Sequence, residues 1–323
     1  MSLLQIKDLH IDLKTRNGEL NLVQDINIEI RKGETFGIVG ESGCGKSLTA
    51  NSIMGLLPNP PLNVREGEIL FKGKDLLKTT EKEKRSIRGN EISMIFQEPM
   101  TALDPLFTIG EQMREAILIH DKSISKEELS KRVIDALKSV GIPRPEKIIS
   151  EFPHQLSGGM LQRVMIGIAM INNPELLIAD EPTTALDVTI QAQILRLMND
   201  LKDNFGSSII MITHDLGVIA QTCERVAVFY AGQVVEVSDT VELFKNPNHP
   251  YTMGLIESVK SLGYKADKLY TISGMVPTAD NFSKGCRFCD RCEKSMDICY
   301  KEVPELKSIG ENHYSRCWLN GEV

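Results

Sequence analysis

The most informative segment of the sequence is Gly40-Glu41-Ser42-Gly43-Cys44-Gly45-Lys46-Ser47. It follows a short apolar run at residues 35–39 and precedes a stretch of helical character at residues 48–57. Glycines let backbone N–H groups wrap a phosphate, and a helix N-terminus adds positive potential. In the pattern G-x-x-x-x-G-K-[ST], Lys46 reaches the phosphate oxygens and Ser47 ligates Mg²⁺. Together with Leu48, every residue of the stretch except Glu41 is therefore predicted to contact a nucleotide.

Carboxylates for magnesium and water are predicted where a buried strand ends. The apolar run at residues 176–179 leads into Asp180, which is predicted to ligate Mg²⁺, and the adjacent Glu181 is predicted to polarise the attacking water. A similar run at residues 92–96 ends in Gln97 instead. Gln97 lacks the charge for the main metal role, but its amide oxygen can contact Mg²⁺ or the lytic water.

A second anion-binding turn is predicted at Ser157-Gly158-Gly159, where a helical segment begins. Two such turns in one chain are explained most simply if the second serves the nucleotide of another copy of the fold. The working unit is then a head-to-tail dimer with ATP at the interface. His214 follows the apolar run at residues 209–213, and we predict that it senses the γ-phosphate and hydrogen-bonds to Glu181.

The remaining periodicities predict an α/β protein. Residues 3–13 and 20–30 alternate apolar and polar side chains around Asn17-Gly18, which predicts an N-terminal antiparallel β layer. The short apolar runs named above predict a parallel sheet buried on both faces. Strand signals vanish over about residues 103–170, which predicts a helical insertion, and Ala231-Gly232 predicts a hairpin. The fold class is thus a P-loop NTPase core with a parallel sheet, the β layer and the insertion.

Cysteines mark a second, smaller domain. Only Cys44 and Cys223 precede residue 285, whereas five of the seven cysteines lie at residues 286–317. In a reducing compartment such a group favours a metal site over a disulfide framework. Zinc and an iron–sulfur cluster both take four thiolates, and the spacing does not separate them. A short tail with little apolar content needs a metal to fold, so we expect a metal-stapled domain here.

Composition and hydropathy argue against a nucleic-acid-binding, membrane-spanning or secreted protein. The chain has 323 residues, a net charge of -7 and a pI near 5.5, which gives no electrostatic reason to expect nucleic acid as a partner. Its longest apolar run, Val164–Ile171, falls far short of the ~18 residues of a membrane span, and its beginning lacks the layout of a secretory signal. We expect a cytosolic chain that reaches the membrane only through a partner.

In chain order, these features resemble an ABC-type ATPase cassette over roughly residues 3–260: the phosphate loop, Gln97, Leu156-Ser157-Gly158-Gly159-Met160, Asp180-Glu181, Thr184-Ala185-Leu186-Asp187 and His214. Residues 96–105 and 248–252 and the C-terminal cysteines further resemble the ATPase subunits of dipeptide and oligopeptide importers. The resemblance implies an ABC ATPase domain at residues 1–245 and a peptide-importer-type domain at residues 246–323. It also implies that the chain lies at the cytoplasmic face of the membrane, where its hydrolysis of ATP drives peptide import.

The partners that the resemblance implies are a sister ABC ATPase, two transmembrane permease subunits and, indirectly, an extracytoplasmic peptide-binding protein. A homodimer is not forbidden, because the chain carries a full set of site residues. Two other functions stay open at this point. One is a soluble ABC ATPase in DNA repair or translation, although such proteins usually carry two cassettes or a long coiled coil. The other is an importer of a non-peptide solute such as nickel.

Members of the resembled family include proteins with a four-iron four-sulfur cluster, and their pattern maps onto Cys286, Cys292, Cys299 and Cys317. Zinc is the alternative, and histidine is common where this chain has Cys289. The family also commonly stacks adenine on an upstream aromatic residue, but residues 11–35 contain no aromatic side chain or histidine. Adenine would then rest on Leu13, on the Arg16 guanidinium or on Val23. Met160 replaces the usual glutamine of the signature sequence.

Overall fold

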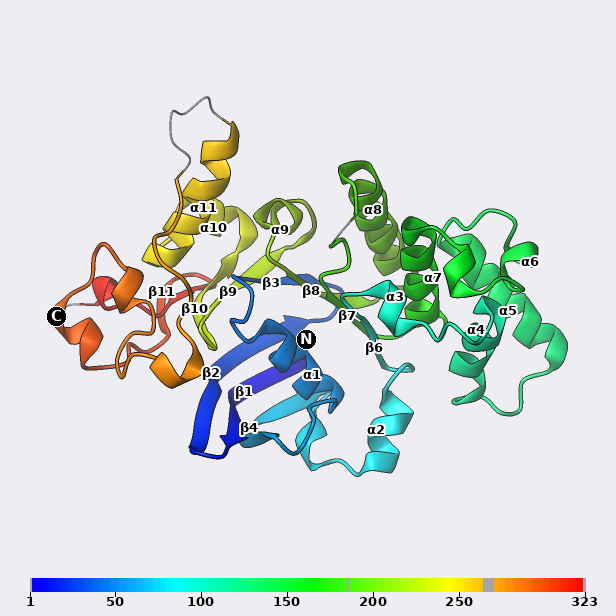
Figure 1. Ribbon diagram of the computed structural model, residues 1–323, viewed down its shortest axis with the longest axis horizontal. Coiled ribbons are helices and arrows are strands. Elements are labelled where there is room, and N and C mark those ends of the chain that lie inside the picture. Colours follow the sequence, from blue (N-terminus) through cyan, green and yellow to red (C-terminus); the bar gives the residue numbers. More distant parts are fainter. Residues whose placement is uncertain (1, 185, 264–269, 322–323) are drawn as a thin grey trace. The chain divides into compact units, whose positions relative to one another are not determined.

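The structure is a computed structural model that describes residues 2–184, 186–263 and 270–321 (Figure 1). The chain forms two compact units. Unit 1 comprises residues 1–31, 35–78 and 212–323, and unit 2 comprises residues 32–34 and 79–211.

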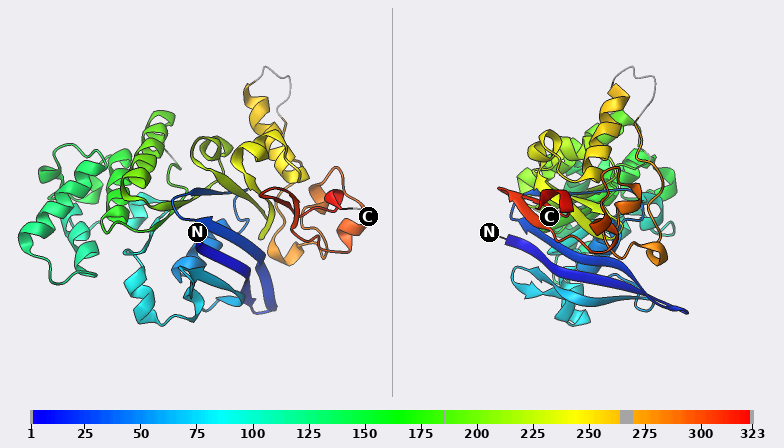
Figure 2. Two further views of the ribbon diagram at one scale, coloured as in Figure 1. Left: turned by 180° about the vertical axis from the view of Figure 1, so that it is seen from behind. Right: turned by 90° about the vertical axis from the view of Figure 1, so that its left-hand side faces the viewer.

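The N-terminal strands of unit 1 form an antiparallel sheet in the order β2-β1-β4-β5. Its strands are β1 (Ser2–Thr15), β2 (Gly18–Arg31), β4 (Leu62–Phe71) and β5 (Lys74–Asp75). Ile26, Ile28 and Ile30 are buried on β2, whereas the intervening Asn27 and Glu29 are exposed, as the period of two requires. The blue and cyan strands lie side by side in both views of Figure 2. The predicted antiparallel β layer is confirmed.

A second sheet region of unit 1 has the strand order β11-β12-β10-β9-β3. These strands are β3 (Thr35–Val39), β9 (Arg225–Tyr230), β10 (Gln233–Asp239), β11 (Lys307–Gly310) and β12 (His313–Ser315). Among the described strands of this region, only β3 and β9 pair in parallel, because β9 and β10 form the hairpin expected at Ala231-Gly232 and β12 pairs antiparallel to β10. The prediction of a parallel sheet is therefore corrected to a mixed one. The C-terminal strands add antiparallel pairs at its edge.

The helices of unit 1 are α1 (Lys46–Met54), α9 (Leu216–Thr222), α10 (Thr240–Lys245) and α11 (Pro250–Gly263), with short 3₁₀ turns after residue 278. Residues 246–323 belong to the same compact unit as the phosphate loop, Gly40–Ser47. The division at residue 245 thus stays a prediction, and β12 joins the C-terminal residues to β10 by strand pairing.

Unit 2 contains β6 (Ile92–Ile95), β7 (Leu176–Asp180) and residues 208–211 of β8 (Ser208–Thr213), in the order β8-β7-β6. Every residue of these strands is buried, as for strands covered on both faces. The helices are α2 (Glu81–Ile87), α3 (Pro99–Ala102), α4 (Ile109–Leu118), α5 (Lys126–Ser139), α6 (Pro145–Ile148), α7 (Gly158–Met170) and α8 (Val188–Phe205). Between residues 103 and 170 the described chain is helical or irregular and contains no strand.

Candidate functional site

The phosphate loop of unit 1 joins the end of β3 to the start of α1. Gly43 and Gly45 adopt positive φ angles of 77° and 98°, which glycine reaches without strain. A Cβ at Gly40 would overlap the backbone carbonyl oxygen of Phe229, so this position accepts only glycine. Gly45 caps α1 without a side chain over the first N–H groups of the helix. The loop therefore has the backbone shape that an anion-binding helix N-terminus needs.

Lys46 is buried within this loop. Its Nζ donates to the carbonyl oxygens of Gly40 at 2.8 Å and Glu41 at 3.0 Å. A phosphate oxygen is a stronger acceptor for this ammonium than a carbonyl oxygen, because the phosphate oxygen itself carries negative charge. The loop thus holds a cation beside the N-terminus of α1, where both can act on the same phosphate.

Cys44 contributes to the loop through its backbone. Its carbonyl oxygen accepts a hydrogen bond from the Gly232 N–H at 3.0 Å, which ties the loop to the β9–β10 hairpin. Burial raises the pKa of its thiol, although Lys46 opposes this shift. A thiol held protonated in this way is a poor nucleophile.

Unit 2 brings Gln97, Glu181 and Thr184 together. Glu181 directly follows β7, and its Oε2 accepts hydrogen bonds from Thr184 Oγ1 at 2.8 Å and from Gln97 Nε2 at 3.2 Å. Glu181 also has a positive φ of 49°, an uncommon conformation for a residue other than glycine. Such outliers cluster at functional sites, where the surrounding structure holds them in place. Asp180, at the tip of β7, is buried.

The serine turn of unit 2 begins α7. Ser157 is the N-cap residue and is exposed, and its side chain makes no capping hydrogen bond. Gly158 is exposed as well. Because the Ser157 side chain does not cap the helix, the first N–H groups of this 13-residue helix can bind an external anion.

The predicted site residues are divided between the units. The phosphate loop, Arg16 and His214 belong to unit 1, whereas Gln97, Ser157, Asp180 and Glu181 belong to unit 2. His214 is exposed just after β8, and Arg16 is exposed in the turn between β1 and β2. The pairing of His214 with Glu181 and the stacking of adenine on Arg16 stay predictions. Of the other two candidates for adenine, Leu13 is half-buried on β1 and Val23 is buried beside Gly45.

The C-terminal cysteines lie near one another, and backbone hydrogen bonds link them. The Cys286 N–H donates to the Cys299 carbonyl oxygen at 2.7 Å. Burial raises the pKa of Cys286 to about 12, and negative charge on the neighbouring sulfurs of Cys299, Cys289 and Cys317 would add to that rise. Burial is also the main cause that raises the pKa of Cys289, Cys292 and Cys317. These four thiols therefore lose their protons less readily than an exposed cysteine does.

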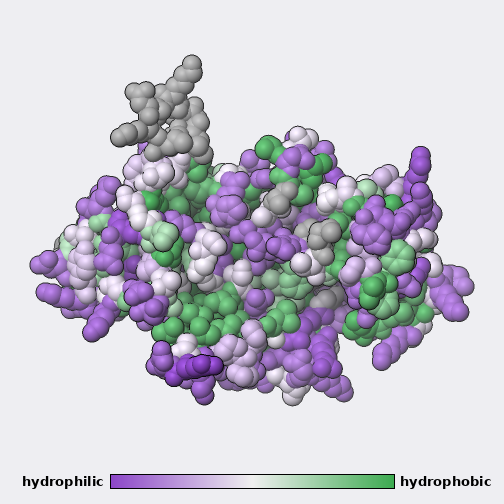
Figure 3. All heavy atoms as spheres, in the orientation of Figure 1, coloured by the Kyte–Doolittle hydropathy of each residue, from purple (hydrophilic) through white to green (hydrophobic). Residues whose placement is uncertain are grey.

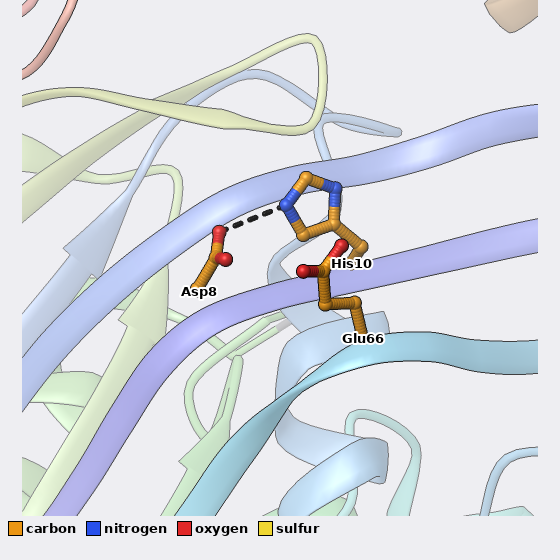
Figure 4. A group of neighbouring side chains, drawn as sticks. All are labelled: Asp8, His10 and Glu66. Atoms are coloured by element: carbon orange, nitrogen blue, oxygen red, sulfur yellow. Dashed lines mark hydrogen bonds and ion pairs between the residues drawn. The ribbon is translucent and has the colours of Figure 1, made fainter.

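The metal-stapled domain is not established by the arrangement of the sulfur atoms. In the described part of the chain, Asp8, His10 and Glu66 form the only set of three or more potential metal ligands within 4.8 Å of one another. Figure 4 shows the hydrogen bond between His10 and Asp8, whose Nε2–Oδ1 distance is 2.9 Å. The other ring nitrogen of His10 meets the Arg65 guanidinium at 2.8 Å, so both nitrogens already have protein partners. The His10 ring is therefore best explained as part of a hydrogen-bond network with Asp8 and Arg65 on the β layer.

Reasoning from the sequence missed the residues that surround Glu41. Arg291 forms an ion pair with the Glu41 carboxylate at 2.8 Å, and the Tyr251 hydroxyl accepts from the Glu41 N–H at 3.1 Å. Both partners lie more than 200 positions away along the chain. No spacing rule in the sequence connects residues at such a separation. The one hint in the sequence was that Tyr251 belongs to Asn248-His249-Pro250-Tyr251-Thr252, a motif on which the resemblance to peptide importers rests.

Two family models match the chain. Residues 23–184 match the family described as "ABC transporter", and residues 235–299 match "Oligopeptide/dipeptide transporter, C-terminal region". The chain is 51% identical to the oligopeptide transport ATP-binding protein OppD of Bacillus subtilis (strain 168), over 98% of this chain and 88% of that protein. It is 46% identical to the dipeptide transport ATP-binding protein DppD of Lactococcus lactis subsp. cremoris (strain MG1363), over 98% and 90%.

Solved structures share the fold. The ATP-binding cassette MJ0796, in a dimeric post-hydrolysis state bound to ADP and Pi, matches with a TM-score of 0.66 at 29% identity, over 73% of this chain and 98% of that one. CbiO1 from Clostridium perfringens, part of the complex cbiONQ, matches with a TM-score of 0.64 at 28% identity, over 76% and 91%. Among the described residues, no helix combines the length and the apolar character that crossing a bilayer requires.

Proposed function

This chain belongs to the ABC transporter family, among the ATP-binding subunits of oligopeptide and dipeptide transporters, and from that premise we propose how its residues work. It is an ABC-type ATPase, and the function it serves is ATP-driven import of oligopeptides or dipeptides. The single observation that carries the catalytic proposal is the pair of hydrogen bonds that holds Glu181 at the end of β7.

Glu181 is proposed to orient the attacking water and accept its proton. Two donors on Oε2 fix the carboxylate, and general-base help of this kind is worth roughly 10²- to 10⁴-fold in rate. Lys46 binds the β and γ oxygens, and His214 contacts the γ-phosphate. Ser47 and Asp180, with Gln97, are the residues that would hold Mg²⁺, and the ion would supply positive charge to the transferring phosphoryl group.

Closure of a dimer is proposed to complete each site. Ser157, Gly158 and Gly159 would bind the γ-phosphate of ATP held by the phosphate loop of a second cassette. The exposed turn at the start of α7 supports this role, because it can meet a ligand from outside its own unit. The MJ0796 cassette, which shares the fold, is dimeric in its solved structure and so sets a precedent. The second cassette is proposed to be a sister ATPase, and a homodimer is the alternative.

Of the two transmembrane permease subunits expected in the complex, one is proposed to dock on unit 2 of this chain. A groove there runs between β6, α4 and α7 and is lined by Phe96, Phe107 and Ile119, all of which are exposed. Leu106 beside it is 80% exposed, and Figure 3 shows apolar surface over α4. An apolar groove of this kind is typical of a surface that binds another protein. The chain would then lie peripherally at the cytoplasmic face and meet the extracytoplasmic peptide-binding protein only indirectly.

The C-terminal thiols are proposed to hold a four-iron four-sulfur cluster on Cys286, Cys292, Cys299 and Cys317. Four thiolates are the ligand set of such a cluster, and the same four could hold zinc as the alternative. The cluster would act as a structural staple. Anaerobic purification should give a brown protein, and a colourless protein with stoichiometric zinc would contradict the proposal.

The function is tested in cells and in membranes. A strain that lacks this chain should recover uptake of labelled di- or oligopeptides when the wild-type chain is returned, but not when Glu181→Gln is returned. Affinity purification from native membranes should bring down two permease chains and the second cassette. Recovery of nickel uptake without peptide uptake, or purification without any membrane subunit, would overturn peptide import.

A further inference from the structure

Arg291, in the C-terminal cysteine region, binds the side chain of Glu41 in the phosphate loop. Its Nη1 and Nη2 donate to the two carboxylate oxygens of Glu41 at 2.8 and 3.1 Å, which is a bidentate pair. The Arg291 side chain is only 7% exposed. Its Nε donates to the Ser273 carbonyl oxygen at 2.8 Å, and its guanidinium lies over the Tyr230 ring. Bonds at all three nitrogens fix the guanidinium in a single orientation.

Glu41 is also held by its backbone. The hydroxyl of Tyr251, on α11, accepts from the Glu41 N–H at 3.1 Å. Tyr251 is fully buried and packs against Tyr230 and Phe288, with ring centroids 4.7 and 5.4 Å away. Phe288 lies in the same short segment as Arg291 (Figure 1, orange to red). The aromatic cluster and the ion pair therefore place Glu41 from two directions.

The position of Glu41 determines where Lys46 can lie. The Glu41 carbonyl oxygen is one of the two backbone acceptors of Lys46 Nζ, at 3.0 Å. The same carbonyl accepts from the Cys44 N–H at 3.4 Å. A rotation of Glu41 would thus move both the lysine contact and the glycine-rich turn that wraps the phosphate.

A second arginine, Arg287, contacts the phosphate loop indirectly, through the β9–β10 hairpin. Arg287 donates to the Ala231 carbonyl oxygen and to Asn21 Oδ1 at 2.8 Å. Ala231 precedes Gly232, whose N–H bonds to the Cys44 carbonyl oxygen. Residues 286–292 therefore reach the phosphate loop at both Glu41 and, through the hairpin, Cys44.

We propose that Arg291 is a positioning residue for nucleotide binding: it holds Glu41, and thereby the phosphate loop, in the conformation that binds ATP. The inference rests on the proposed nucleotide site. Preorganisation of a loop improves affinity because the cost of ordering the loop is not incurred on binding. The C-terminal region is thus part of the ATP-binding machinery of this chain, although it touches no predicted nucleotide contact directly.

Affinity for ATP tests the proposal in the full-length purified chain. Arg291→Ala should raise the Kd for a fluorescent ATP analogue by about tenfold or more, because hydrogen bonds to charged groups are lost. Arg291→Lys keeps the charge but cannot form a bidentate pair, so its Kd should lie between the two. Lys294→Ala removes an exposed charge from the same region and serves as the matched control.

A double-mutant cycle identifies the partner. Glu41→Gln keeps the size of the side chain and removes its charge, and its Kd should also rise. If Arg291 acts through Glu41, the double variant should bind ATP no more weakly than Arg291→Ala alone. In the assembled transporter, KM for ATP should rise while kcat changes less than twofold, which a general loss of folding would not produce.

Three outcomes would overturn the inference. Arg291→Ala could bind ATP as tightly as Lys294→Ala, the two single effects could multiply in the double variant, or kcat could fall with KM unchanged. If Arg291→Ala does not fold, the Kd for ATP of Glu41→Gln tests the proposal by itself. A Kd equal to that of the wild-type chain would then refute it. A wild-type chain that binds no ATP would instead overturn the proposed nucleotide site, and the inference with it.

Discussion

The hydroxyl of Thr184 gives a specific check on the catalytic role of Glu181. Thr184 Oγ1 donates to Glu181 Oε2 at 2.8 Å, and Gln97 Nε2 donates to the same oxygen at 3.2 Å. A hydrogen bond to a charged group contributes about 1.5–3 kcal/mol, and we reduce this to about 1 kcal/mol because Thr184 is exposed. Thr184→Ala removes the nearer of these two donors to the carboxylate. Its kcat should therefore fall about fivefold.

The assay is phosphate release by the assembled transporter at saturating Mg–ATP. Thr184→Ser keeps the hydroxyl and should hydrolyse ATP at nearly the wild-type rate. Glu181→Gln removes the base and should lose roughly 10²-fold or more, with ATP binding retained. The reasoning is wrong if Thr184→Ala matches the wild type, if serine is as poor as alanine, or if Glu181→Gln turns over normally.

Three further predictions concern particular residues. Ser157→Ala should slow hydrolysis in the dimer by about tenfold without weakening ATP binding to the isolated chain, and a parallel loss of binding would contradict action on the partner's nucleotide. Burial lowers the pKa of His249 to about 4 from 6.5. Protons therefore favour the unfolded chain below pH 6.5, and the free energy of unfolding should fall by about 3 kcal/mol between pH 6.5 and 4. Urea denaturation of His249→Asn should show a shallower fall, and identical slopes would refute this. Cys299→Ser should abolish bound iron and raise the Kd for ATP, because the turn that carries Arg291 is then less ordered; unchanged iron content would exclude Cys299 as a ligand.

Part of the fold was predictable because its signals are local. The alternation on β2 specifies a half-buried strand, and the Ala231-Gly232 pair specifies a tight turn. The mixed character of the main sheet was not predictable in full. Strand β12 has three residues, His313–Ser315, and a run this short has no periodicity that reveals its pairing with β10.

The same distinction applies to the site. Gly40–Ser47 determined the phosphate loop from sequence alone, because a contiguous run sets its own backbone through glycine conformations and a following helix. The folded chain alone brings the Gln97 amide to Glu181, 84 positions away, and Arg291 to Glu41, 250 positions away. Contacts at such separations depend on how sheets and turns pack. Packing energy is spread over many side chains, so no short pattern in the sequence records which distant pair it brings together.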